Sequence, residues 1–420
     1  MHPNEPLTRR QALRAGLTAL AVPTVLSAAE AAGSLKFRLK EEAGLRRFGY
    51  PVHTLLPKVK GSKNFRLTRS GRPVPAQFRE TVGLDGAPAV ALDFSASPGP
   101  LESERYVVEH GKGIEPGPEP KGGMAIEHVS STFRVTNGGS LAYVVPDNLL
   151  GFLKGVRGGK TEYLRELPDQ GLYLRYRDDI HYRAGGFGPD GVPTRATIAR
   201  QGPLAIGLRF ESTEAVRGER SVASVVELTF PSSKSWVEAT WTVTDPEGFI
   251  GGLGVDLPLR IDGNPTLVDL GARSTVYGTL KGRERMTLRA GHAPGLDNDE
   301  ARAWRIHKGQ PEILTTFAEE MATETEHPAE GWTHVMDSTR CTALAVADFG
   351  AATRDRIEVD ADGRVQAWRD FAGGGALPAK SRKSFRFWLH FVPMPVQVGA
   401  LTSPQAMLAP LRVEWDARPR

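Results

Sequence analysis

The densest group of polar and aromatic side chains in the sequence lies in residues 173–183. If its first part is a strand, alternate residues face the same side, and a turn at two aspartates separates them from a second short stretch. The candidate catalytic residues are Arg177, His181, Tyr182 and Arg183, and the candidate substrate contacts are Tyr173 and Arg175. Arginine neutralises a carboxylate, imidazole accepts a proton and a phenol returns one. β-Elimination on a uronate sugar needs these groups, although a salt-bridged surface hairpin has the same composition.

A second group lies in a strand expected over residues 384–392. Alternation places Phe385 and Phe387 on the core face, with Arg386, Trp388 and His390 on the other face. An aromatic plate, a fixed cation and a titratable ring can together stack a sugar and hold its carboxylate. We therefore name these three residues as candidate substrate contacts. The alternative is an outer face whose tryptophan packs beneath a loop.

A third group occupies residues 331–337, where Trp332 and His334 share one face of an expected strand. We name His334 as a second candidate base and Trp332 as a substrate contact, against the alternative of a hydrogen-bonded packing histidine. Carboxylates in residues 296–300 could bind Ca²⁺ through oxygen ligands, but a solvated loop explains them better, because the spaced Gly and bidentate Glu of a calcium loop are missing. No other metal or cofactor is predicted, because the sequence has no phosphate-binding loop or HExxH motif; it also has no GxSxG motif of a serine nucleophile.

The elements that must position these groups are strands. The 46 glycines and 31 prolines make up about 18% of the 420 residues, against roughly 12% in an average protein. Short apolar runs alternate with turn residues, and hairpins are expected over 225–243 and 357–368. The one helix expected covers residues 317–324. The sequence thus predicts an all-β fold in which a small N-terminal β-barrel or sandwich precedes a large antiparallel β-sandwich of the mutarotase-like super-sandwich type.

Three boundaries divide the chain. Residues 1–32 read as a twin-arginine signal peptide, with Arg9 and Arg10 ahead of a short apolar run and small residues at the end. The small β domain follows over 33–110, a linker rich in proline and glycine over 111–123, and the large sandwich over 124–420. This order predicts a periplasmic or secreted protein, whereas a basic amphipathic helix of the mature fold is the alternative.

Net charge and cysteine content limit the classes of partner that we expect. The net charge is +4, and no block of lysine and arginine stands out, so a nucleic-acid partner is not expected. No cysteine lies at the expected cleavage site, so no lipid anchor is expected either. The single cysteine, Cys341, sits in an apolar run and is expected to be a buried, inert thiol.

Short segments resemble a known family. Residues 44–52 (GLRRFGYPV), 72–79 (RPVPAQFR) and 99–109 (GPLESERYVVE) resemble the N-terminal β-barrel of bacterial exo-rhamnogalacturonan lyase-like proteins. Residues 236–241 (WVEATW) and 268–271 (VDLG) are similar to that family's central β-sandwich. The family's C-terminal toroid of paired helices has no counterpart here, and no catalytic residue can be carried over from it.

Three hypotheses of function follow, each with a poly- or oligosaccharide as partner. The first is an exported polysaccharide lyase that cleaves a uronate-containing glycan by β-elimination. The second is a glycan-binding β-sandwich protein without turnover. The third is a mutarotase-like sugar isomerase, which would need a histidine beside a glutamate such as Glu227 or Glu238.

Overall fold

The fold was analysed in a computed structural model. It describes residues 33–57, 59, 64–83, 86–121, 123–138, 141–176, 180–186, 193–216, 220–245, 247–262, 266–272, 276–291, 304–309, 319–324, 329–351, 354–371, 381–395 and 403–416. Strands dominate these residues, and their only α-helix is the short α2 (Pro404–Leu408). The fold is therefore all β, as the sequence predicted. None of the described helices is long and apolar enough to cross a membrane.

The small domain is built from two antiparallel sheets. A five-stranded sheet has the order β30-β1-β7-β3-β4, and a three-stranded sheet has the order β2-β6-β5. Their bounds are β1 (Gly33–Lys40), β2 (Tyr50–Leu55), β3 (Phe65–Arg69), β4 (Arg72–Val74), β5 (Ala76–Val82), β6 (Pro88–Ala96), β7 (Ser103–His110) and β30 (Arg412–Trp415). Strand β30 pairs with β1, so the end of the described chain completes the small domain's sheet. The sequence assigned residues 124–420 to the large sandwich and did not predict that β30 belongs to the small domain's sheet. Pairing between strands so far apart in the chain leaves no local signal in the sequence.

A nine-stranded antiparallel sheet forms one side of the large sandwich, in the order β15-β16-β17-β18-β29-β26-β25-β20-β21. Its strands are β15 (Arg195–Arg200), β16 (Ala205–Val216), β17 (Arg220–Pro231), β18 (Trp236–Asp245), β20 (Thr266–Leu270), β21 (Val276–Leu280), β25 (Trp332–Met336), β26 (Arg340–Val346) and β29 (Ser381–Pro393). The hairpin expected over 225–243 is confirmed by the pairing of β17 with β18.

Two further sheets form the other side of the sandwich. The eight-stranded sheet has the order β14-β13-β19-β28-β27-β22-β23-β24, and the five-stranded sheet has the order β12-β11-β10-β9-β8. The first contains β13 (Gly171–Tyr176), β14 (His181–Arg183), β19 (Ile250–Pro258), β22 (Arg285–Gly291), β23 (Trp304–Gly309), β24 (Glu319–Glu324), β27 (Arg354–Asp360) and β28 (Arg364–Asp370). The second contains β8 (Met124–Val129), β9 (Thr132–Asn137), β10 (Leu141–Pro146), β11 (Gly155–Gly158) and β12 (Thr161–Glu162).

The helix expected over residues 317–324 is wrong. Residues 319–324 form strand β24, which pairs with β23 at the edge of the eight-stranded sheet. Alanine, glutamate and methionine favour a helix locally, but pairing with a neighbouring strand outweighs that preference. The hairpin expected over 357–368 is confirmed, because β27 and β28 pair around the turn at Gly363.

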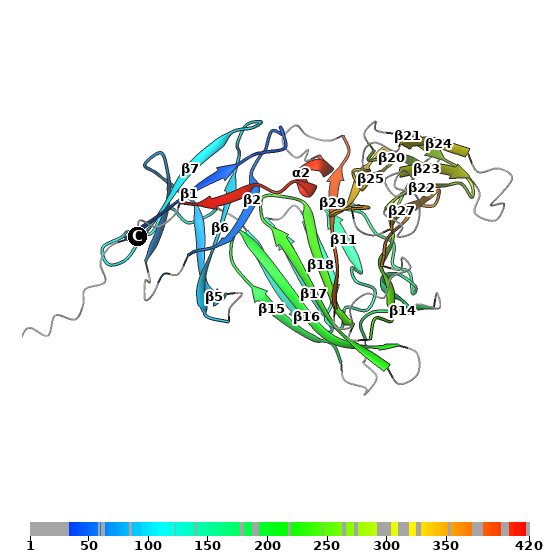
Figure 1. The fold of residues 1–420 in the computed structure, drawn as a ribbon, viewed down its shortest axis with the longest axis horizontal. Coiled ribbons are helices and arrows are strands. Elements are labelled where there is room, and N and C mark those ends of the chain that lie inside the picture. Colours follow the sequence, from blue (N-terminus) through cyan, green and yellow to red (C-terminus); the bar gives the residue numbers. More distant parts are fainter. Residues whose placement is uncertain are drawn as a thin grey trace, which may run out of the picture.

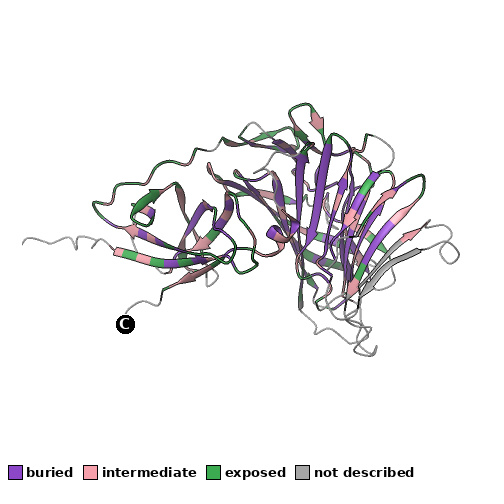
Figure 2. Ribbon diagram, turned by 90° about the horizontal axis from the view of Figure 1, so that it is seen from above, coloured by how far each residue is buried: buried purple, intermediate pink, exposed green. Residues whose placement is uncertain are grey.

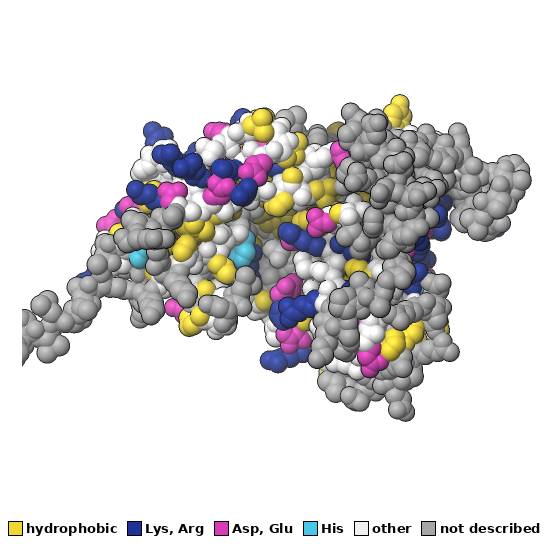
Figure 3. All heavy atoms as spheres, viewed as in Figure 1, with side chains coloured by type: hydrophobic (Ala, Val, Ile, Leu, Met, Phe, Trp, Pro, Cys, Tyr) yellow, Lys and Arg dark blue, Asp and Glu magenta, His cyan; other side chains and the backbone are white. Residues whose placement is uncertain are grey.

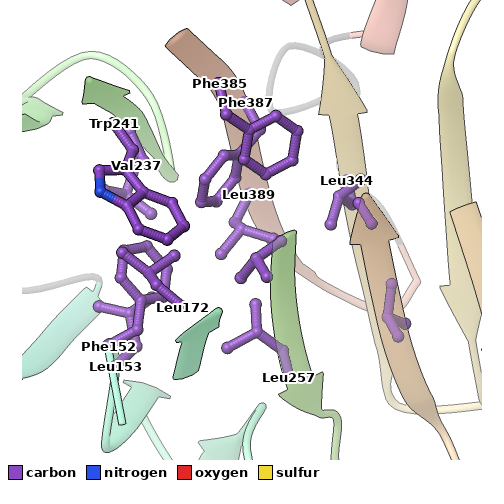
Figure 4. Close-up of a cluster of buried hydrophobic side chains, with 14 of the residues drawn as sticks. Phe152, Leu153, Leu172, Val237, Trp241, Leu257, Leu344, Phe385, Phe387 and Leu389 are labelled. Atoms are coloured by element: carbon purple, nitrogen blue, oxygen red, sulfur yellow. The ribbon is translucent and has the colours of Figure 1, made fainter. Parts of the chain in front are cut away.

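The main core lies between the sheets of the sandwich. Phe385, Phe387 and Leu389 of β29 point into it, as alternation predicted, and all three are buried. Figure 4 shows them beside Trp241 of β18 and across from Phe152. The outward residues of both sides of the sandwich therefore face away from each other.

A second core joins the small domain to the sandwich. It continues from the small domain's sheets to the outer face of the nine-stranded sheet, where Trp236, Trp332 and Trp388 are buried. The small domain lies at one end of the molecule and the sandwich at the other (Figure 1). Buried strand residues are most concentrated in the sandwich (Figure 2). The small domain thus covers part of a sheet face that alternation alone would leave exposed.

Candidate functional site

The first predicted group lies on the outer face of the eight-stranded sheet. Strand register aligns Tyr173, Gly254, Trp368 and Arg356 in one row across β13, β19, β28 and β27. The alternate residues of these strands are buried in the main core. We call the outward set the polar sheet face; it comprises Tyr173, Arg175, His181, Arg183, Arg356, Trp368 and Asp370.

Trp368 organises the polar sheet face. A Cβ atom at Gly254 would lie 2.4 Å from the Trp368 ring, so the glycine lets the indole lie across β19. The ring of His181 stacks on Trp368 at 4.7 Å between centroids, and the Arg356 guanidinium lies 5.5 Å from its centre. Trp368 is only 4% exposed whereas His181 is exposed. The indole therefore orients the imidazole and has little surface left for stacking a ligand.

Ion pairs fix the other side chains of this region. Arg175 Nη2 lies 2.9 Å from Asp370 Oδ1, and Arg175 also donates to the Gly251 carbonyl. Arg364 donates to both carboxylate oxygens of Asp256 at 2.7 Å, and this hydrogen bonding raises the pKa of the Arg364 guanidinium. The His181 imidazole, stacked on Trp368, thus lies in a region where Arg175 and Arg364 are held by ion pairs.

The structure separates the predicted members of this group. His181 and Arg183 project with Tyr173 and Arg175, but Tyr182 points to the opposite side of β14, where it is half-buried against the main core. The expectation that Tyr182 acts beside His181 is therefore corrected, because neighbouring residues of a strand face opposite sides. Tyr173 is the phenol on the correct face, and its hydroxyl donates to a backbone carbonyl. Arg177 lies outside the described residues.

The second predicted group lies on the outer face of the nine-stranded sheet. Arg386 and Trp388 are both held by Glu238: Arg386 Nη2 lies 2.7 Å from Glu238 Oε1, and the indole N–H donates to Oε2 at 3.2 Å. Trp388 and His390 are 2% and 3% exposed because the small domain covers them. The expected sugar-stacking face is therefore wrong for these two residues, and only Arg386 reaches solvent.

Burial at the domain junction lowers the pKa of both His390 and Lys234. Burial lowers the pKa of His390 to about 3, and the charges of Lys234 and His334 add to the effect. Burial likewise lowers the pKa of Lys234 to about 8. A neutral His390 packs edge-on against Trp236 at 6.0 Å between ring centroids. We infer that His390 is a packing residue.

The third predicted group lies on the same outer face. Trp332 is buried beneath the small domain and donates to Glu330 at 2.6 Å, which fits a packing role. His334 Nδ1 lies 2.9 Å from Asp269 Oδ1, and its ring is partly exposed. Because His334 and His181 lie on outer faces of opposite sheets, they cannot act on one bound group.

A groove that the sequence did not predict lies over the five-stranded sheet. Its volume is about 600 Å³. Its charged lining residues are Arg134, Lys154, Arg157, Arg165, Arg260, Glu162 and Glu166, which leave an excess of three positive charges. We call it the basic groove. These residues come from three strands and three connecting segments, so no local cluster of charge marks the groove in the sequence.

Charge elsewhere is more evenly matched. Basic and acidic side chains intermingle over β1 and β7 of the small domain (Figure 3), where Lys40 and Arg412 both pair with Glu414. The excess in the basic groove is therefore a local property. Its anion-attracting field is strongest at low ionic strength, because salt screens exposed charges over about 10 Å.

Residues 165–169 connect the basic groove with the eight-stranded sheet. Arg165, which lines the groove, donates to the backbone carbonyl of Asp362 in the β27–β28 turn at 2.8 Å. Asp169 pairs with Arg364 on the outer side of that sheet at 2.9 Å. The side chain of Arg183 donates to the Pro168 carbonyl. The groove and the polar sheet face are thus tied to the same short segment.

Other candidate chemistry has little support. The carboxylates at 296–300 lie outside the described residues, and no group of three or more metal-ligating side chains occurs within the described part of the chain. Cys341 is buried, and burial raises the pKa of its thiol to about 12. The thiol is thus protonated at neutral pH, as expected for an inert cysteine.

Comparison with known proteins shows similarity of fold. No family model matches the chain, and no curated protein matches it in sequence. A glycosyl hydrolase family 38 protein from Enterococcus faecalis has a TM-score of 0.56 at 11% identity, covering 92% of this chain and 48% of that one. An α-mannosidase from Enterococcus faecalis V583 has a TM-score of 0.57 at 11% identity, covering 92% and 46%. A putative aldose 1-epimerase from Klebsiella pneumoniae has a TM-score of 0.39 at 9% identity, covering 67% and 86%.

The first two comparisons concern one part of larger proteins. This chain spans less than half the length of either solved structure, although they cover most of it. At such identities the likeness defines the arrangement of strands and no particular residue. The molecule is thus an all-β protein in which a small β domain packs on a large antiparallel sandwich.

Proposed function

We propose that the protein is carbohydrate-active and binds an acidic polysaccharide along the basic groove and the polar sheet face. The observation that carries the proposal is the excess of three positive charges in a groove of about 600 Å³. A groove of this charge suits a polymer that carries carboxylates at regular intervals. The sugar-related descriptions of the two solved structures with similar folds agree with a glycan ligand.

The finer proposal is cleavage of a uronate-containing glycan by β-elimination at the polar sheet face. His181 would take the proton from the carbon beside the carboxylate, and that electron pair would form a double bond to the next carbon. The bond from that carbon to the leaving oxygen breaks, and Tyr173 would give the oxygen a proton. Arg183 would balance the charge that builds up on the carboxylate. This proposal agrees with the family resemblance in the sequence.

Binding without turnover is the second candidate. It is favoured by the engagement of Arg175 with Asp370 and of Arg183 with the Pro168 carbonyl, since a neutralising arginine must turn toward its substrate. An isomerase of the mutarotase type receives less support. Glu238 lies beside Arg386 and Trp388, and His390, two residues further along the paired strand, is buried.

Binding is tested with polygalacturonate and variants that differ by the same charge. The double variant Lys154→Gln/Arg157→Gln removes two exposed cations from the basic groove. The matched control, Lys36→Gln/Arg38→Gln, removes two exposed cations from β1. We expect the groove variant to weaken binding at least tenfold at low salt and the control to bind as the wild type does. Equal binding by both double variants would refute the groove as the binding site.

Turnover is tested separately. Elimination creates an unsaturated uronate that absorbs in the near ultraviolet, so its release from a panel of uronate polymers can be followed directly. We expect His181→Gln to abolish release while polymer binding persists. If the wild type releases no such product from any uronate polymer it binds, the elimination proposal fails and binding without turnover stands.

We also propose that the protein is exported to the periplasm or beyond the cell. Residues 1–32, which carry the twin-arginine pattern, lie outside the described residues. Export is tested by fractionating cells that make the full chain and the Arg9→Lys/Arg10→Lys variant. A wild-type protein confined to the cytoplasm would contradict the proposal.

A further inference from the structure

A charged cluster lies where the small domain meets the edge of the nine-stranded sheet. Strand register aligns His53, Asp93 and Gln77 across β2, β6 and β5. Gln77 reaches across the junction, donating to the Gln201 carbonyl at 3.2 Å and accepting from the Leu204 N–H at 3.4 Å. The three-stranded sheet and the β15–β16 connection are therefore held together at this point.

Asp93 is the centre of the cluster. Its Oδ1 atom lies 2.5 Å from His53 Nδ1 and 2.5 Å from Arg200 Nη2, and its side chain is 1% exposed. A carboxylate can only accept, so His53 donates from Nδ1, and its other ring nitrogen, Nε2, takes no part in this contact. The His53 ring is 48% exposed, so a molecule from solvent can reach it.

The buried side of the cluster has unused hydrogen-bonding capacity. Asp93 Oδ2, Arg79 Nε and Arg200 Nε are buried and have no hydrogen-bond partner among the described residues. Buried polar atoms are usually paired, and leaving one unpaired costs roughly 1–3 kcal/mol. Two N–H donors therefore lack acceptors, and one carboxylate oxygen lacks a donor.

The two guanidinium groups of the cluster also repel each other. Arg79 and Arg200 lie close enough for their charges to repel, whereas Asp93 pairs directly with Arg200 and Glu238 also attracts it. Burial, aided by Arg79, lowers the pKa of the Arg200 guanidinium. An added anion would offset the repulsion between the two guanidinium groups and accept hydrogen bonds from the free N–H donors.

We propose that this junction binds a small polyhydroxy acid, a carboxylate whose carbon skeleton also carries several hydroxyl groups, as in a single uronate sugar. The ligand's carboxylate accepts from the Nε–H groups of Arg79 and Arg200, and its hydroxyl donates to Asp93 Oδ2. The Nε2 atom of His53 forms a hydrogen bond with a second hydroxyl. The site uses none of the residues of the basic groove or the polar sheet face, so it does not rest on the function proposed above.

The test uses D-galacturonate as the probe, with neutral D-galactose as the ligand control. Binding is measured by calorimetry for the full protein and for Arg79→Gln, with Arg72→Gln as a matched variant at an exposed position of the same domain. We expect galacturonate to bind, galactose to bind at least tenfold more weakly, and Arg79→Gln to lose tenfold or more. Arg72→Gln should bind as the wild type does.

A second measurement guards against variants that fold poorly. The imidazole resonances of His53, assigned with His53→Gln, should shift when galacturonate is added to the wild type and remain unmoved in Arg79→Gln. Lys154→Gln/Arg157→Gln, which tests polymer binding, should leave the shift intact. Absence of the shift in the wild type, equal binding of galactose, or full binding by Arg79→Gln would overturn the proposal.

Discussion

Replacing His390 by leucine should make the protein less sensitive to acid. Its side chain is 3% exposed at the junction of the two domains, and its Nε2 atom has no hydrogen-bond partner among the described residues. The change removes the titratable group and keeps an apolar side chain of similar size against Trp236. The variant therefore has no imidazole at the domain junction, where burial disfavours the charged form of His390.

The size of the effect follows from the pKa of His390. Burial lowers that pKa from its ordinary value of 6.5 to about 3, so the unfolded chain takes up a proton first as the pH falls. The folded state consequently loses stability from about pH 6.5 downward, until the folded imidazole also protonates near pH 3. Each pH unit in this window corresponds to about 1.4 kcal/mol, so acidification to pH 4.5 costs about 2–3 kcal/mol through this residue.

The assay is urea unfolding at pH 7 and pH 4.5. We expect the loss of unfolding free energy between the two pH values to be about 2–3 kcal/mol smaller in His390→Leu than in the wild type. His128→Gln is the control, because its ring is half exposed beside Asp147 and lies outside the buried domain junction. An equal acid-induced loss in the wild type and His390→Leu would refute the reasoning.

Three further perturbations follow from packing and burial. Gly254→Ala should destabilise the fold by about 1–3 kcal/mol and change the near-ultraviolet circular dichroism of Trp368, because the new methyl group meets the indole; an unchanged spectrum would contradict this. Lys383→Met should lower the free energy of unfolding in urea by about 3–5 kcal/mol. Lys383 Nζ lies 2.7 Å from Asp245 Oδ2, and the variant leaves this buried carboxylate without its cationic partner. A loss below 1 kcal/mol would be inconsistent with this reasoning. Cys341 should react with a thiol reagent at pH 8 only in denaturant, and rapid labelling of the folded protein would show that its thiol is accessible.

Alternation along strands could be predicted from the sequence because it is a local property. It correctly separated Phe385 and Phe387 from Trp388 and His390 on β29. It could not show what covers the outer face, since the small domain that buries Trp388 comes from a distant part of the chain. The buried tryptophan therefore resembled an exposed platform when only the sequence was considered.

The candidate site depended on register, which the sequence does not reveal. Trp368 lies over Gly254 and beneath His181 only because β28, β19 and β13 are neighbours in the sheet. The alternation of Arg364 and Trp368 was a usable signal for an outward polar face, but nothing local linked it to His181. The pairing of His53 with Asp93 is similar, because forty residues separate them in the chain.

The central claim is that the basic groove and the polar sheet face recognise the charge of an acidic glycan. The most direct measurement compares the Kd of an oligogalacturonate with that of the same oligomer after methyl esterification, which removes the charges and keeps the sugar backbone. Our account predicts that the free acid binds at least tenfold more tightly at low salt, and that the difference shrinks as salt screens the charges. Equal affinity for the acid and the ester, at any salt concentration, would contradict it.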